Sequence, residues 1–269
     1  MTQVITFGNF KGGVGKTSNS TMVALELSNR GFKTLLVDLD PQGNATNLYL
    51  KTKLNISNEV GHFDKTLMSS VEDGNLDSSI INIKDNLDLL ASAPDFSLYP
   101  RYMEKLHNYN DRVKEFDRLL TPLKAKYDYV IIDIPPTISL ITDSALYASD
   151  YCLIVMQTHE HSFEGAEAFI KYIQEEVIDE YQAPRLELVG ILAVLLQAGA
   201  PVDEATVANA ISEFGEENLF KTRIHSMQRL KRYGVTGITF KSKFDKRVFA
   251  VYKDVTDELL KRIEVIEHG

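Results

Sequence analysis

Apolar runs alternate with stretches of helical periodicity along most of the chain. The runs are continuous, which is typical of parallel strands buried on both faces, and they lie at residues 2–8, 33–39, 127–133, 151–158 and 186–196. Between them, the spacing of apolar residues predicts helices over 18–30, 101–121, 139–149, 163–180, 202–214 and 248–266. We therefore expect a single doubly wound α/β domain over residues 1–269, with a mainly parallel sheet and helices on both faces.

The pattern is weaker in two parts of the chain. Between residues 48 and 100, only 87–91 has the composition of a strand, and 63–70 that of a short helix. Near the C-terminal end, 219–225 is the candidate for a last strand. No repeat, low-complexity segment or linker interrupts the alternation, so the sequence does not divide into two domains.

A glycine-rich segment follows the first predicted strand and opens the first helix. A strand, a glycine-rich turn and a helix N-terminus form a phosphate cradle, because backbone N–H groups and the helix dipole face the anion. Lys16 is expected to reach the β- and γ-phosphates, and the Thr17 hydroxyl to coordinate Mg²⁺. The predicted nucleotide-binding residues are Lys11, Gly12, Gly13, Val14, Gly15, Lys16, Thr17 and Ser18.

This segment departs from the general pattern G-x-x-x-x-G-K-[ST]. Phe10 stands in the place of the first glycine, and a second lysine, Lys11, precedes the glycines. The segment resembles the deviant Walker A motif of the ParA/MinD family of P-loop ATPases. The resemblance implies that Lys11 contacts the nucleotide held by the opposite subunit of a sandwich dimer.

Two aspartates follow the second predicted strand, at the end of the sheet where ligands bind in open α/β folds. Asp38 and Asp40 open the segment D-x-D-P-Q-G-N-A-T, which is similar to the corresponding segment of ParA-like proteins. The resemblance implies that Asp40 positions the attacking water, and we assign Asp38 a supporting role near the metal. Either aspartate could instead form a turn or cap a helix, since Asp favours such positions.

A third block, residues 128–136, is an apolar run that ends in Asp133 and two prolines. It looks like a Walker B motif, in which Asp133 would hold Mg²⁺ through a water. Pro135 and Pro136 would begin the loop that senses the γ-phosphate. The predicted metal residues are therefore Thr17, Asp133 and Asp38, and the predicted catalytic residues are Lys11, Lys16, Asp40 and Asp133.

Composition restricts the alternatives within this family. The chain has a single cysteine, Cys152, which argues against a disulfide framework and against iron–sulfur relatives with paired cysteines. The longest apolar run, 188–196, is well short of the ~20 residues that span a bilayer. The last residues mix acids and bases, unlike a basic membrane-binding tail. We expect a cytoplasmic protein without stable membrane association.

Charge is distributed unevenly. The net charge is −9, yet residues 221–247 contain nine Lys or Arg and a single acid. A basic segment on an acidic body is typical of a local nucleic-acid contact, although a merely solvated basic face would give the same composition. The candidates for phosphate contacts are Arg223, Arg229, Lys231, Arg232, Lys241, Lys243, Lys246 and Arg247.

Together these features resemble a small ParA/Soj-like partition ATPase. The resemblance implies an ATP- and Mg²⁺-dependent homodimer that binds DNA without sequence preference and joins the nucleoid when ATP is bound. It also implies a ParB-type centromere-binding partner that stimulates slow ATP hydrolysis. The alternative is a MinD-like or cargo-positioning ATPase that acts on a membrane or a protein scaffold.

Overall fold

A computed structural model describes residues 2–269 except 62–64, 107, 159 and 198. It contains an eight-stranded sheet with the order β3-β4-β2-β5-β1-β6-β7-β8. Seven strands run parallel, and β3 pairs with β4 in the antiparallel sense at one edge. The strands are β1 (Gln3–Gly8), β2 (Thr34–Asp38), β3 (Ile80–Lys84), β4 (Leu87–Leu90), β5 (Tyr129–Asp133), β6 (Tyr151–Gln157), β7 (Glu187–Leu196) and β8 (Ile224–His225).

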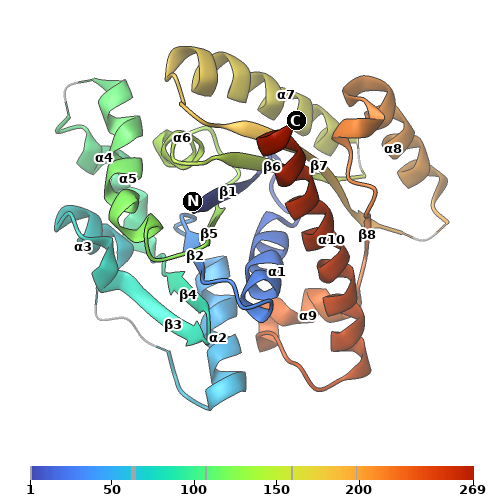
Figure 1. Ribbon diagram of the computed structural model, residues 1–269, viewed down its shortest axis with the longest axis horizontal. Helices are drawn as coiled ribbons and strands as arrows, with labels where there is room; N and C mark the ends of the chain where they lie inside the picture. Colours follow the sequence, from blue (N-terminus) through green and yellow to red (C-terminus); the bar gives the residue numbers. More distant parts are fainter. Residues whose placement is uncertain (1, 62–64, 107, 159, 198) are drawn as a thin grey trace.

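Helices cover both faces of this sheet (Figure 1). One layer is made of α1 (Lys16–Asn29), α2 (Asn44–Ser57), α9 (Gln228–Thr236) and α10 (Lys243–His268). The other is made of α3 (Leu67–Glu72), α4 (Tyr99–Met103), α5 (Tyr109–Lys124), α6 (Leu140–Tyr147), α7 (Glu160–Tyr172) and α8 (Pro201–Phe214). The doubly wound, mainly parallel α/β fold predicted from the sequence is confirmed.

The strands supply both layers because their side chains alternate between the two faces. Val4 and Val130 pack into the core under α5 and α6, whereas Ile5 and Ile131 pack into the core under α1 and α10. All four are fully buried. Continuous apolar runs therefore mark strands with a hydrophobic core on each side, as the sequence predicted.

Two helices of the layer around α1 were not predicted. Helix α2 begins at Asn44 without a side-chain cap, and it packs against α1, α9 and the sheet through three buried apolar residues, Ala45, Leu48 and Tyr49. Helix α9 lies inside the basic segment, and Leu230 and Tyr233 are the buried residues of this helix. Helices with only two or three buried apolar residues give little periodic signal, so tertiary contacts decide their existence.

Other boundaries also differ from the prediction. The helix expected over 101–121 is two helices, α4 and α5, and the Asn108 side chain caps the second by accepting from the amide of Asp111. A helix was expected over 163–180; the structure has α7 up to Tyr172, followed directly by a π-helical segment, Ile173–Glu180. The last strand is only Ile224–His225, with one isolated bridge between Ile191 and Leu219. The short helix expected over 63–70 lies at Leu67–Glu72, and residues 63 and 64 are outside the described part.

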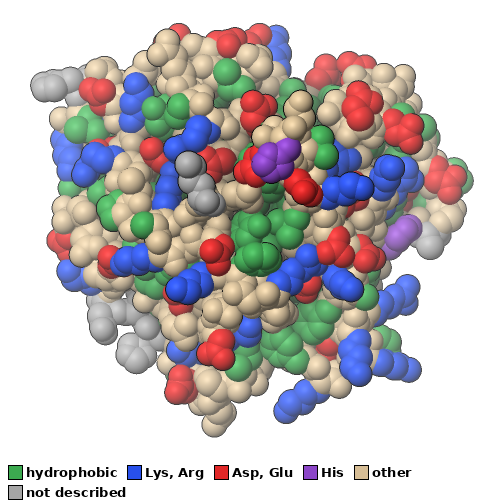
Figure 2. All heavy atoms as spheres, viewed as in Figure 1, with side chains coloured by type: hydrophobic (Ala, Val, Ile, Leu, Met, Phe, Trp, Pro, Cys, Tyr) green, Lys and Arg blue, Asp and Glu red, His purple; other side chains and the backbone are tan. Residues whose placement is uncertain are grey.

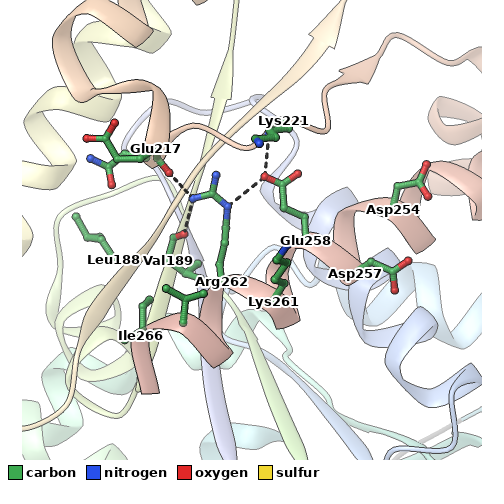
Figure 3. A pocket seen from close by; sticks show the side chains of 12 residues that line it. Leu188, Val189, Glu217, Lys221, Asp254, Asp257, Glu258, Lys261, Arg262 and Ile266 are labelled. Carbon is green, nitrogen blue, oxygen red and sulfur yellow. Dashed lines mark hydrogen bonds and ion pairs between the residues drawn. The ribbon is translucent and has the colours of Figure 1, made fainter. Parts of the chain in front are cut away.

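Helix α10 is joined to the start of β7 by one arginine (Figure 3). The Arg262 guanidinium donates to the carbonyls of Val189, Glu217 and Leu219 and forms an ion pair with Glu258 at 3.1 Å. Glu258 in turn accepts from the backbone amides of Lys221 and Thr222. These contacts fix the connection between β7 and β8 to α10 at the amino-terminal edge of the sheet. No helix among the described residues is long and apolar enough to cross a membrane.

Candidate functional site

A cavity of about 800 Å³ opens at the carboxyl ends of β1, β2 and β5. The three sequence blocks predicted to bind nucleotide and metal all contribute to it, although the first and third are more than a hundred residues apart in the chain. Its walls also include α2 and α9. The lining residues that carry polar side chains are Lys16, Thr17, Ser18, Asp40, Gln42, Asn44, Asn47, Lys51, Thr137 and Lys231.

The glycine-rich loop connects β1 directly to α1. Gly13 and Gly15 have φ values of 78° and 91°, in the left-handed region that favours glycine. Gly15 is the N-cap of α1, and no side chain caps that helix. Its first backbone N–H groups therefore have no side-chain acceptor, which is the arrangement that binds phosphate in P-loops.

Asn9 and Phe10 fasten the loop to the rest of the fold, and the sequence did not identify this role. The Asn9 amide donates to the carbonyl of Val155 at 3.0 Å, and its oxygen accepts from the backbone N–H of Lys11 at 2.7 Å. Phe10 packs edge-on against Phe169 and Tyr172 of α7. Phe10 can replace the usual glycine because its side chain points into this aromatic cluster rather than at the phosphates.

Lys16 points back into the glycine-rich loop. Its ammonium donates to the carbonyls of Asn9 at 2.8 Å and Lys11 at 3.2 Å. Burial lowers the pKa of Lys16 to about 8, while the nearby Asp133 and Asp40 carboxylates oppose that shift. A desolvated cation held at this place is suited to bind phosphate oxygens, because added negative charge would stabilise its protonated form.

Asp133 stands at the end of β5, opposite Thr17 at the start of α1. The Thr17 hydroxyl donates to Asp133 Oδ2 at 2.7 Å, whereas the buried Asp133 Oδ1 has no hydrogen-bond partner. Burial, and next the Asp38 carboxylate, raise the pKa of Asp133. A divalent cation would satisfy the unpartnered oxygen and favour the charged carboxylate, so this hydroxyl–carboxylate pair fits Mg²⁺.

Asp38 has a different set of contacts. Its oxygens accept from the backbone N–H and the hydroxyl of Thr46, both at 2.8 Å, and from the backbone N–H of Asp40 at 3.1 Å. Burial raises the pKa of Asp38 and these hydrogen bonds oppose the shift. Asp38 therefore ties the start of α2 to the end of β2, which matches a supporting role better than direct metal ligation.

Asp40 and Lys11 are both accessible at the rim of the site. Asp40 is half-buried and accepts from the backbone N–H of Gln42 at 2.9 Å. The remainder of its carboxylate faces the cavity. Lys11 is exposed and does not line the cavity of its own subunit. Its side chain is therefore available to a ligand that approaches from outside this cavity.

A second cavity, of about 880 Å³, lies at the carboxyl ends of β7 and β8. It is bordered by Gln197 after β7, by Ser226 and Met227 after β8, and by Val248 and Val251 of α10. The two cavities share Lys231 as a lining residue. The sequence did not indicate this cavity, because its walls come from loops and helix faces without a motif.

The predicted DNA contacts gather on one end of the molecule (Figure 2). Blue side chains project at the lower right of that view, where Figure 1 places α9 and the start of α10. Seven of the eight candidates are exposed: Arg223, Lys231, Arg232, Lys241, Lys243, Lys246 and Arg247. We call these seven residues the basic surface.

Arg229 differs from the other seven candidates. Its guanidinium forms an ion pair with the fully buried Asp245 at 2.6 Å, and hydrogen bonds with Asp245 raise the pKa of Arg229. Asp245 also accepts from the hydroxyls of Tyr233 and Thr239 and completes a capping box with Ser242 at the start of α10. Arg229 thus connects α9 to α10, a structural role that its sequence position did not reveal.

Comparison with known proteins identifies the family. A family model described as an AAA domain, AAA_31, matches residues 2–188. The sporulation initiation inhibitor protein Soj of Bacillus subtilis is 29% identical over 235 residues, which are 86% of this chain and 87% of that protein. The chromosome partitioning protein ParA of Myxococcus xanthus is 31% identical over 221 residues, which are 80% and 72% of the two chains.

Solved structures agree on the fold. Cobyrinic acid a,c-diamide synthase of Mycobacterium smegmatis, solved with a bound ATP analogue and magnesium, superimposes with a TM-score of 0.78 at 22% identity. The match covers 97% of this chain and 95% of that chain. At this identity the likeness shows the fold alone, and the family rests on the sequence matches. The chain belongs to the AAA_31 family, and its relatives place it with the ParA/Soj-like partition ATPases.

Proposed function

We propose that this protein is a DNA-partition ATPase that dimerises on ATP, binds DNA without sequence preference and hydrolyses ATP slowly. One observation carries the enzymatic part of the proposal. Thr17 lines the same cavity as Lys16 and Asp40, and its hydroxyl donates to Asp133, which lies buried behind it with one unpartnered oxygen. These residues combine a cation that can bind phosphate (Lys16), a pair that can hold a metal ion (Thr17 and Asp133) and a carboxylate that can orient water (Asp40).

The chain's own residues would act mainly through position and charge. The loop amides and Lys16 bind and orient the triphosphate, and Lys16 offsets charge that develops on the phosphoryl oxygens. Thr17 and Asp133 hold Mg²⁺, which when bound neutralises phosphate charge. Asp40 accepts a hydrogen bond from the attacking water and keeps it in line. Such a site needs no covalent intermediate.

Lys11 would complete the site from the opposite subunit. It is exposed beside the cavity, while its backbone N–H is held by Asn9. A homodimer that joins two such faces would place each Lys11 near the partner's nucleotide. ATP binding and dimer formation would then depend on one another.

DNA would bind to the basic surface. It carries seven accessible cations, whereas the rest of the chain outside residues 221–247 is strongly acidic. Lysine and arginine side chains on one face attract the phosphate backbone of DNA. Acidic side chains that lie elsewhere on the protein repel that backbone only weakly. Binding of this kind would place the ATP-bound dimer on the nucleoid, and a ParB-type protein would release it by stimulating hydrolysis.

The test is duplex DNA binding measured without nucleotide, with ADP–Mg²⁺ and with ATP–Mg²⁺, each at two salt concentrations. We expect binding with ATP only, and a steep loss of affinity as salt rises. DNA binding that ignores nucleotide, or no binding while ATP still induces dimers, would contradict the DNA-partition proposal.

One observation favours a second candidate, an ATPase that positions cargo on a membrane. Val235, Phe240 and Phe244 are exposed by 77%, 37% and 58% beside the lysines of the basic surface. Exposed apolar side chains next to cations suit an anionic lipid interface. Sedimentation with phosphatidylglycerol vesicles separates the two candidates, since a DNA-partition protein should stay in the supernatant with or without ATP–Mg²⁺.

A further inference from the structure

Helix α9 borders both cavities at the carboxyl end of the sheet. Leu230, Lys231 and Gly234 line the cavity over the phosphate loop, while Gln228, Arg229 and Lys231 line the cavity beside β7 and β8. Within the described part of the chain, Lys231 is the residue common to both. If a nucleotide bound with its triphosphate in the first cavity and its base in the second, the part between them would lie next to Lys231.

Contacts with α2 and α10 hold α9 in this position. Lys51 donates to the carbonyl of Gly234 at 3.0 Å, and Asn55 donates to the carbonyls of Thr236 at 2.9 Å and Ile238 at 3.1 Å. These bonds occupy carbonyls at the C-terminal end of α9 that the helix itself leaves unpaired. On the other side, Arg229 is bound to Asp245 of α10. The cation at position 231 is therefore carried on a fixed helix rather than on a loop.

Neighbouring residues on α9 face different surroundings. Arg232 follows Lys231 but lines neither cavity, and both side chains are exposed. Successive residues on an α-helix point about 100° apart, so one can face a ligand while the next faces solvent. Arg232 therefore serves as a matched control of like charge and exposure.

We propose that Lys231 binds the nucleotide of its own subunit, at the part of the ligand between the base and the β-phosphate. This inference rests on the proposed ATP-binding function. The ligand chemistry is a nucleoside di- or triphosphate whose α-phosphate or ribose oxygens accept from the ammonium. Ser18 lines the same cavity at the start of α1, where helix N-terminal amides suit phosphate.

The test is the affinity of purified Lys231→Gln, Lys231→Arg and Arg232→Gln variants for ADP–Mg²⁺ and ATP–Mg²⁺, measured by titration calorimetry. Because a hydrogen bond to a charged group would be lost, we expect Lys231→Gln to lower the affinity for ADP and the affinity for ATP by about tenfold each. Lys231→Arg should retain most of the affinity. Arg232→Gln should bind both nucleotides like the wild type and lose affinity for DNA instead. Thermal unfolding of each variant establishes that it is folded.

The outcomes are distinguishable. Wild-type affinity for both nucleotides in Lys231→Gln, in a wild-type protein that binds ATP, would overturn the inference and leave the proposed function intact. A loss confined to ATP would also overturn it, because it would place Lys231 at the dimer contact or near the γ-phosphate. If the wild-type protein bound neither nucleotide, the proposed function itself would fail.

Discussion

Lys11 and Lys16 lie five positions apart in the same loop, yet their surroundings are opposite. Lys16 is buried and donates to two loop carbonyls, whereas Lys11 is exposed and lies outside the cavity of its own subunit. A buried, preorganised cation can bind a phosphate within the subunit. An exposed cation beside the opening is available to a partner that approaches from outside, and this difference can be tested by substitution.

We predict that Lys11→Ala keeps ATP binding within a few-fold of the wild type but loses ATP-dependent dimerisation. The reason is that a contact across the dimer adds affinity only when the partner is present. Analytical ultracentrifugation with ATP–Mg²⁺ measures this, with the exposed Lys171→Ala as the control. A Lys11→Ala variant that still dimerises would show that the lysine does not act between subunits.

We predict that Asp40→Ala binds ATP and dimerises but turns over at least about a hundredfold more slowly, because the water loses its hydrogen-bond acceptor. ATP hydrolysis under stimulation and the lifetime of the DNA complex are the measurements, and the complex should persist. The exposed Asp73→Ala is the control. Turnover near the wild-type rate would remove Asp40 from the catalytic assignment.

At the scale of elements, α9 and the start of α10 form one unit around a buried carboxylate. Asp245 is fully buried and accepts from Arg229, Tyr233, Thr239 and the backbone of Ser242. These hydrogen bonds hold the pKa of Asp245 well below its usual range. The unit carries most of the basic surface and also borders both cavities, so its rigidity would affect both the proposed DNA surface and the proposed nucleotide site.

We predict that Asp245→Asn lowers the free energy of unfolding by about 2 kcal/mol at pH 7, after allowance for the part-exposed Arg229. A carboxylate with a depressed folded pKa stabilises the protein above its unfolded pKa of about 3.9, and this stabilisation is lost as pH falls through lower values. Urea unfolding should therefore show that the difference in the free energy of unfolding between the two proteins begins to shrink below about pH 4 and keeps shrinking as pH falls further. Asp73→Asn, at an exposed ion pair with Lys65, should change little at any pH. An equal difference at pH 7 and pH 3 would exclude the ionic contribution.

At the scale of the molecule, charge is separated rather than balanced. The net charge of −9 conceals the +8 carried by residues 221–247. Six of the nine cations in this segment lie on α9 or at the start of α10, at one end of the molecule (Figure 2). Long-range repulsion between DNA and the acidic body would orient the molecule with that end toward the duplex. Affinity should accordingly depend on how many of these cations meet phosphates.

We predict that replacing Lys243 and Lys246 together by Gln weakens ATP-dependent DNA binding and reduces the slope of log K against log salt by up to about 2, because each phosphate contact contributes about 0.9 to that slope. Both lysines are exposed and line neither cavity, so nucleotide affinity should not change. Lys126→Gln with Lys171→Gln is the control of equal charge on the acidic body. An unchanged slope in the Lys243/Lys246 variant would place the DNA elsewhere.

Much of the fold could be predicted from the sequence because its strands are buried on both faces. Such strands are continuous apolar runs in the sequence. The runs 151–158 and 186–196, for example, predicted strands whose bounds differ by only one residue from those of β6 and β7. The missed elements, α2, α9 and β3, each bury only two or three apolar side chains, so their sequences carry little periodic signal and tertiary contacts decided them. Prediction failed where a short element depends on its neighbours.

The sequence by itself determined the phosphate loop, its second lysine and the order of the aspartates, because each is a local pattern in which chain spacing sets the chemistry. Only the tertiary structure decided which groups meet. In the folded protein one oxygen of Asp133 has no hydrogen-bond partner, and Asp38 accepts a hydrogen bond from Thr46. Phe10 packs against an aromatic ring of α7, and Arg229 forms an ion pair with Asp245 instead of joining the basic surface. The tertiary structure also placed Lys231 between two cavities that no motif marks. These outcomes depend on packing between segments distant in the chain, and residue spacing does not encode such contacts.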